Sequence, residues 1–246
     1  MRPILAFDTA TPCARVAVLS PEGHCLATAE KVAARHSSNL LRLCDEVLRA
    51  TGVTVADLAA LACGGGPGSF TGLRVGLAVA KGLALADKIP LLLVSSLDAL
   101  AADLAAVSPA PLVLPCIDAG KGQVYGRLYR ADGETPAAIG ADELALAPED
   151  LCRLVQVQAA GAAILTGGNG ADRYLEIFRA QLGTESVREQ IAGPSALAVG
   201  RLALARLARG EHDDLETSVP RYGRPPDITK PTVSAAGASA RDRAPR

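Results

Sequence analysis

The sequence holds few of the side chains that stack on nucleic-acid bases. It has no tryptophan, and its aromatic content is 3%. Its formal net charge is −1 at pH 7, so the chain has no global basic field that would attract a polyanion. A strong, independent nucleic-acid binder is therefore excluded, because such proteins combine a basic groove with aromatic platforms.

Residues for metal and nucleophile chemistry are equally sparse. The three histidines (His24, His36 and His212) form no HxxxH or HExxH pair, so we expect no metal site. Ser69 lies in GPGSFTG, which departs from the GxSxG pattern of an esterase. These absences weigh against a metallopeptidase and against a serine hydrolase.

Signals for export and for membrane insertion are also missing. The six cysteines include no CxxC pair, and several lie in apolar runs, where a free thiol acts as a small hydrophobic residue. No stretch reaches the length of about 18 apolar residues that a membrane-spanning helix needs. Asp8 interrupts the first apolar run, which is unlike a secretory signal. We expect a reduced, cytoplasmic protein without membrane segments.

Apolar residues and glycine are abundant. Hydrophobic residues make up 49% of the chain, enough for a substantial core. The most distinctive stretch is a glycine-rich block at 64–76, which follows a predicted strand at 58–63 and enters a predicted helix at 70–86. Ser69 or Thr71 can cap the first turn of that helix.

Two interpretations of the glycine-rich block remain open. A glycine-rich turn at a helix N-terminus can hold an anion or a partner's backbone. The block matches neither GxxxxGK[ST] nor GxGxxG, so from the residues alone a structural turn is favoured. The helix carries only Arg74 and Lys81 as charges between Gly64 and Ala86. It must therefore be buried on nearly all sides, either in a core or against another protein.

One device occurs twice along the chain. An apolar strand ends in an aspartate, a turn of small residues follows, and a second strand returns, at Asp8 and again at Asp118, about 110 residues later. We predict two homologous lobes, 1–108 and 109–223, followed by a disordered tail at 224–246 that is rich in proline, alanine, serine and arginine. This arrangement resembles the two-lobed actin-like (ASKHA) ATPase fold, an α/β fold in which each lobe has a mixed sheet that starts with a β-meander and is flanked by helices.

Several segments resemble one protein family in the same order. GGGPGSFTGLRVGLAVAKGLAL, from residue 64, is similar to the most characteristic segment of the TsaB (YeaZ) family. ILAFDTATPCARVAVL, ARHSSNLL, SSLDALA and CIDAGKGQVYGRLY are also similar to that family. The resemblance is close in the first half of the chain and loose in the second. It implies an actin-like fold and the role of a non-catalytic partner in bacterial threonylcarbamoyl-adenosine tRNA modification.

Two sets of site residues follow from these resemblances. In actin-like ATPases, aspartates at such turns organise Mg²⁺ and glycine turns hold the nucleotide. The corresponding vestigial or interfacial nucleotide-binding residues are Asp8, Thr9, Thr11, Asp118, Gly167, Gly168 and Asn169. The alternatives are that each aspartate caps its own turn and that 167–170 is a plain strand–helix turn. The predicted partner interface, on helices at about 38–50 and 70–86, consists of His36, Leu40, Leu41, Phe70, Leu73, Arg74, Val75, Gly76 and Leu77.

The favoured hypothesis is a scaffold without independent catalysis. The resemblance implies that it dimerises with a TsaD-type catalytic subunit and, with a TsaE-type ATPase, supports threonylcarbamoyl transfer to the adenosine 3′ of the tRNA anticodon. We expect a homodimer when the chain is alone, contact with tRNA only through the complex, and no tightly bound cofactor, with ATP or ADP entering in the complex. We also expect Gly76→Arg to abolish complex formation and leave the fold intact. The alternatives are an active small-molecule kinase or ATPase of the same fold and, least favoured, a metallopeptidase.

Overall fold

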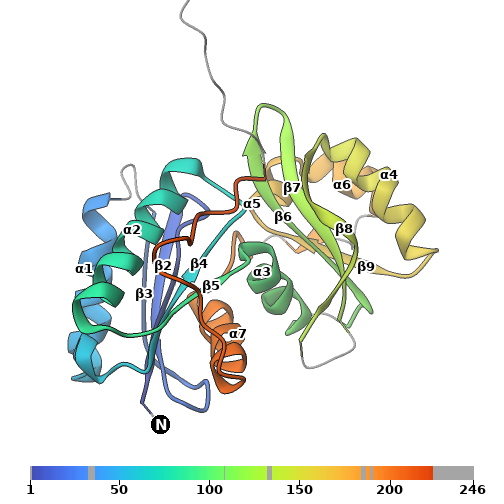
Figure 1. Cartoon of the computed structure of the whole chain (residues 1–246). Helices are drawn as coiled ribbons and strands as arrows, with labels where there is room; N and C mark the ends of the chain where they lie inside the picture. Colours follow the sequence, from blue (N-terminus) through green and yellow to red (C-terminus); the bar gives the residue numbers. More distant parts are fainter. Residues whose placement is uncertain are drawn as a thin grey trace, which may run out of the picture.

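Both halves of the chain form the same kind of sheet (Figure 1). The computed structural model describes residues 2–32, 37–107, 109–131, 135–183, 187–188 and 191–223. The first sheet has the strand order β3-β2-β1-β4-β5, and the second has the order β10-β9-β6-β7-β8. The first comprises β1 (Ile4–Asp8), β2 (Cys13–Leu19), β3 (Cys25–Val32), β4 (Ala60–Gly64) and β5 (Leu91–Val94). The second comprises β6 (Leu112–Gly120), β7 (Gln123–Arg130), β8 (Ala137–Leu146), β9 (Ile164–Gly167) and β10 (Val187–Arg188).

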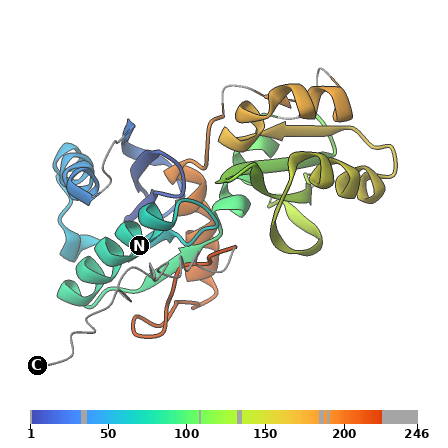
Figure 2. The ribbon, with the colours of Figure 1, turned by 90° about the horizontal axis from the view of Figure 1, so that it is seen from above.

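The two sheets have equivalent topology. Adding five to each strand number of the first sheet gives the second sheet read backwards. In each, three strands form an antiparallel meander, and the next strand then pairs parallel with the first strand of that meander. The predicted α/β fold, two actin-like lobes that each begin with a β-meander, is confirmed. Figure 2 shows the two lobes side by side from above.

The first sheet is covered on both faces. Leu5 and Phe7 of β1 point into a core with α1 (Ser37–Thr51) and α2 (Phe70–Asp87). Ile4 and Ala6, which alternate with them, point into a second core with α7 (Ala196–Ala208). A strand that is apolar on both faces needs cover on both, which explains the unbroken apolar run at the start of the chain.

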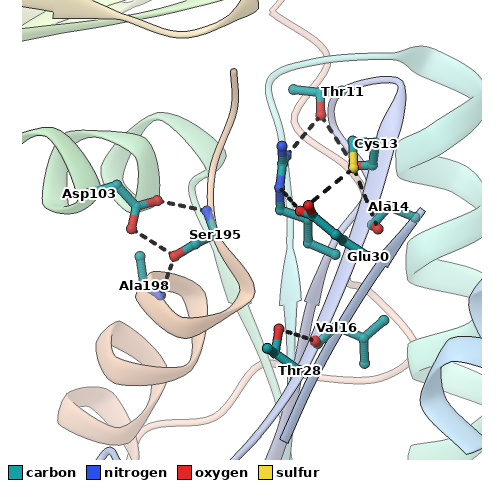
Figure 3. Close-up of polar contacts among 10 residues, drawn as sticks. Thr11, Cys13, Ala14, Val16, Thr28, Glu30, Asp103, Ser195 and Ala198 are labelled. Atoms are coloured by element: carbon teal, nitrogen blue, oxygen red, sulfur yellow. Dashed lines mark hydrogen bonds and ion pairs between the residues drawn. The ribbon is translucent and has the colours of Figure 1, made fainter. Parts of the chain in front are cut away.

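Helix α7 lies in the stretch predicted as the second lobe, 109–223, yet it packs on the first sheet (Figure 1). Its contact face is made of small residues, which allows a close approach. A Cβ built on Gly200 would lie 2.5 Å from Leu19 Cδ1. The helix is also fixed at its first turn. Ser195 accepts from the Ala198 N–H and donates to Asp103 of α3 (Ser96–Ala105), as Figure 3 shows.

Helix α3 joins the two lobes. Its buried leucines pack against Val113 and Ile117 of β6 and Tyr129 of β7. The Tyr129 hydroxyl donates to Asp98 Oδ1 at 2.7 Å, so the second sheet is also linked to α3 by a hydrogen bond. The lobes therefore share one apolar cluster and do not meet only at a linker.

The remaining elements belong to the second lobe or to the loop before β4. Helices α4 (Pro148–Ala159) and α6 (Leu175–Leu182) contribute to the core on the second sheet. The helical stretch after β9 is divided into α5 (Asn169–Arg173) and α6, because the backbone leaves helical geometry at Tyr174. A short 3₁₀ helix, η1 (Val55–Asp57), precedes β4.

Within the described part of the chain, no helix is both long and apolar enough to cross a membrane. The predicted tail at 224–246 lies outside the described residues.

Candidate functional site

The glycine-rich block is a packed turn whose backbone donors are used within the chain. The Gly65 N–H donates to Val94 O at 2.7 Å, and the Ser69 N–H donates to Ala10 O at 2.7 Å. The Gly66 N–H donates to Ser96 Oγ at 3.3 Å. Ser69 is the N-cap of α2, as predicted, and accepts from the Gly72 N–H. These amides are not directed at an open anion site, which favours the structural turn over the phosphate cradle.

Asp8 is completely enclosed at the end of β1. Its Oδ1 accepts from the Ala10 N–H at 2.7 Å, and its Oδ2 accepts from the Ser96 hydroxyl at 2.7 Å. A Cβ built on Gly64 would lie only 1.8 Å from Oδ2, so glycine is required there. Burial raises the pKa of Asp8 from 3.8 to about 6, and the two hydrogen bonds oppose that rise. The carboxylate caps its own turn and is bound to α3, so it faces no space for an ion.

Thr9 and Thr11 are also engaged internally. Thr9 Oγ1 donates to Gly72 O at 2.8 Å, and a Cβ on Gly76 would come within 2.4 Å of that hydroxyl. Thr11 Oγ1 donates to Cys13 O at 3.2 Å (Figure 3). The small residues of α2 therefore allow the helix to pack closely against the turn between β1 and β2. The residues around Asp8 do not fit a Mg²⁺–nucleotide site in this arrangement.

The second set of predicted nucleotide-binding residues is brought together at the end of β6. Asn169 Oδ1 accepts from the Asp118 N–H at 3.2 Å, and a Cβ on Gly168 would lie 2.2 Å from Cys116 O. Gly167 ends β9. Asp118 Oδ1 accepts from the Gly120 N–H, and its Oδ2 pairs with Arg173 at 2.7 Å. These contacts are those of a close strand–helix turn, and nucleotide binding at this point stays a prediction.

The predicted partner interface needs correction. His36 lies outside the described residues. Leu40, Leu73, Gly76 and Leu77 are buried in the chain itself, Leu40 and Leu77 in the core under α1 and α2. They cannot contact a partner, because the face of α2 that carries the small residues points inward. The expectation that Gly76→Arg would leave the fold intact is wrong for the same reason, since Thr9 occupies the space.

The outer face of α1 and α2 is narrower than predicted, and on α1 its exposed leucine lies among charged side chains. Leu41 is 51% exposed and Phe70 42% exposed, while Arg74 is exposed and Val75 half-buried. Leu85, which the sequence analysis missed, is 71% exposed near the end of α2. Its position seven residues after Ala78 on the outer face was a signal that the uniform apolar character of the helix concealed. We call Leu41, Phe70, Arg74, Val75 and Leu85 the outer helix face.

Tyr222 is a further site residue that sequence reasoning did not place. Its ring centroid lies 4.8 Å from that of Phe70, and its hydroxyl accepts from Arg74 Nε at 3.0 Å. The short sequence Pro220-Arg221-Tyr222, near the end of the predicted second lobe, was its only signal. Among the described residues, no group of three or more histidines, cysteines, aspartates or glutamates could hold a metal ion.

Known proteins with similar sequences and structures identify the family of this chain. A model of the family described as TsaD, tRNA N6-adenosine threonylcarbamoyltransferase, matches residues 28–164. The solved structure of YeaZ from Pseudomonas aeruginosa is 32% identical and has a TM-score of 0.78, and the match covers 90% of this chain and 100% of that chain. The chain belongs to the TsaB (YeaZ) family. Two curated relatives carry the name tRNA threonylcarbamoyladenosine biosynthesis protein TsaB: that of Escherichia coli (strain K12), 40% identical over 129 residues, and that of Bacillus subtilis (strain 168), 34% identical over 127 residues.

The curated relatives align with only part of this TsaB-family chain. The alignments with both curated relatives cover 52% of the chain and 55% of the relative, so the chain spans about half the length of the curated relatives it matches. The activator of 2-hydroxyisocaproyl-CoA dehydratase from Clostridium difficile, with bound ADPNP, is 11% identical with a TM-score of 0.50 and shares the fold.

Proposed function

We propose that this TsaB-family chain is a non-catalytic subunit in the synthesis of threonylcarbamoyl-adenosine on tRNA. In this role it dimerises with a TsaD-type catalytic subunit and supports threonylcarbamoyl transfer to the adenosine 3′ of the anticodon. The names of the curated relatives support the pathway. The dimerisation rests on the surface described above.

The observation that carries the proposal is the outer helix face. Leu41, Phe70 and Leu85 are large and exposed, yet both cores of the first lobe are complete without them. Large apolar side chains left exposed on a folded domain indicate an interaction surface when they gather on one side of it, and aromatic and arginine side chains are enriched in the centres of such surfaces. When the catalytic subunit is absent, a second copy of the chain would cover the same face, giving a homodimer.

The surroundings of Asp8 support a role without independent catalysis. A kinase or ATPase of this fold would need this carboxylate to hold Mg²⁺ or to position the attacking group. Here both of its oxygens accept hydrogen bonds from the chain, and burial favours its protonated form. The alternative of an active small-molecule kinase is therefore disfavoured.

Cofactor and further partners follow from the same proposal. We expect the isolated chain to hold no nucleotide tightly, and ATP or ADP to enter only in the complex that also contains a TsaE-type ATPase. With a net charge of −1, the chain would contact tRNA only through its partners. The work of this subunit would be to hold the catalytic subunit in its active form in the cytoplasm.

Reconstitution tests the proposal. Unmodified tRNA, ATP, threonine and bicarbonate are incubated with the other pathway proteins, and threonylcarbamoyl-adenosine is measured with and without this chain. We expect modification to require the chain and to be lost with Leu41→Asp. Leu154→Asp, at a leucine that is 43% exposed on α4, and Asp118→Ala should retain it. Modification that does not need the chain, together with ATP hydrolysis by the chain alone, would instead favour the kinase.

A further inference from the structure

The last described segment of the chain binds the start of α2. This closing segment, residues 213–223, is drawn from orange to red in Figure 1 and runs past α2 toward the second lobe. Asp213 is held at β5, where its N–H donates to Leu91 O and its Oδ2 accepts from the Leu93 N–H. Further along, the Arg221 N–H donates to Gly65 O at 2.8 Å.

Close packing fixes the end of this segment. A Cβ on Gly66 would lie 2.6 Å from Arg221 O, and a Cβ on Gly223 would lie 2.6 Å from Cε1 of Tyr125. Glycines at both places allow the closing segment to lie directly on the glycine-rich turn and on the second lobe. Tyr222, between two anchored residues, is thereby held in place before any partner binds.

Tyr222 fixes the orientation of a positive charge near the N-terminus of α2, that of Arg74. Arg74 Nε donates to the Tyr222 hydroxyl at 3.0 Å, and the guanidinium carbon lies 3.9 Å from the centroid of Phe70 and 5.8 Å from that of Tyr222. Within the described residues, no carboxylate pairs with Arg74. The structure thus holds an exposed guanidinium in a defined orientation, and in the described ranges no carboxylate engages its two Nη groups.

An exposed cation–π contact alone contributes only about 0.5–1 kcal/mol to stability, so by itself it does not indicate a binding role. Three features argue otherwise. The tyrosine is anchored by backbone contacts, no carboxylate of the described residues pairs with the guanidinium, and the cluster forms part of the outer helix face. Pre-oriented arginines flanked by aromatic rings are typical of residues that dominate binding energy at protein interfaces.

We propose that Tyr222 is a positioning residue for Arg74, and that Arg74 binds a carboxylate side chain of the catalytic subunit. This inference rests on the proposed function. A carboxylate fits because a guanidinium forms two parallel hydrogen bonds with it. A protein partner is favoured over an RNA phosphate because the flanking side chains are apolar and because the guanidinium already covers a face of Phe70, which a base would need for stacking.

The test measures the dissociation constant between the full chain and the TsaD-type subunit. Arg74→Ala should weaken binding about 30-fold, as truncation of a dominant interface arginine does. Tyr222→Phe keeps the ring but removes the hydroxyl acceptor, and it should weaken binding about 5-fold. In the Arg74→Ala background, Tyr222→Phe should have no further effect, because the tyrosine acts through the arginine. Tyr174→Phe is the matched control, since Tyr174 lies beside Arg173 at 5.7 Å on the second lobe, and it should leave binding unchanged.

Other results would overturn the inference in distinguishable ways. If Leu41→Asp abolishes binding while Tyr222→Phe leaves it unchanged, the positioning role is wrong and the proposed function stands. If neither variant affects binding, the proposed function fails as well. If Tyr222→Phe has the same effect with and without Arg74, the tyrosine does not act through the arginine. If Arg74→Ala changes tRNA binding by the assembled complex but not the affinity of the two subunits, the ligand is a phosphate.

Discussion

Replacing Asp8 with asparagine should stabilise the protein at neutral pH. The native state raises the pKa of this buried carboxyl from 3.8 to about 6, so the folded protein binds the proton more tightly than the unfolded chain does. The contribution of protonated Asp8 to the free energy of unfolding is therefore fully present below pH 3.8. It is lost as the pH rises from 3.8 to 6. At 1.36 kcal/mol per pH unit, that interval corresponds to about 3 kcal/mol.

Asparagine retains the geometry without the charge. Its carbonyl oxygen can accept from the Ala10 N–H as Oδ1 does, and its amide can donate to Ser96 Oγ. The gain at pH 7 should reach up to about 3 kcal/mol, and this figure already includes the attraction between Asp8 and Arg15, because that attraction lowers the pKa of Asp8. At pH 4 the gain should fall close to zero.

Urea unfolding of both proteins between pH 4 and pH 8 measures this effect. The informative quantity is the difference in the free energy of unfolding at each pH, because contributions from all other carboxyls cancel. Asp45→Asn, at an exposed residue paired with Arg49, is the matched control and should change stability by less than about 1 kcal/mol. A difference between Asp8→Asn and wild type that does not vary with pH, or a variant that is less stable at pH 7, would refute the reasoning.

Three further predictions concern packing, capping and thiol reactivity. Gly76→Ala should destabilise the protein by about 1–3 kcal/mol in thermal or urea unfolding, because its Cβ would lie 2.4 Å from Thr9 Oγ1. Gly82→Ala on the same helix has nothing within 4 Å and should stabilise by about 0.5–1 kcal/mol, so equal effects of the two would contradict the packing of α2. Ser195→Ala should lower the free energy of unfolding by about 1–2 kcal/mol, because it removes the cap of α7 and a donor to Asp103, while Ser20→Ala in an exposed turn should have little effect. With a thiol reagent at pH 8, exposed Cys25 should react first. Cys63 and Cys116 should react only after unfolding, because burial raises the pKa of both thiols well above the ordinary value. Early labelling of either buried thiol would show that its core opens in the native state.

The sequence by itself determined the local elements and the duplication. The apolar strand that ends at Asp8 and its repeat at Asp118 predicted two lobes with the same β-meander. The glycine-rich block predicted the turn into α2 and a cap at Ser69 or Thr71, of which the structure uses Ser69. These features depend on residues close together in the chain, whose periodicity and turn chemistry can be read directly.

Only the tertiary structure decided which surfaces meet. The uniform apolar character of α2 could not indicate that its small residues at Gly72 and Gly76 seat on Thr9, leaving Phe70 and Leu85 outside. Nor could the sequence show that Ser96 encloses Asp8, or that α7 returns to the first sheet. Each of these contacts joins residues far apart in the chain. Shape complementarity and the hydrogen bonding of buried polar groups decide which apolar or small faces pack together. Both depend on the folded arrangement of the whole chain.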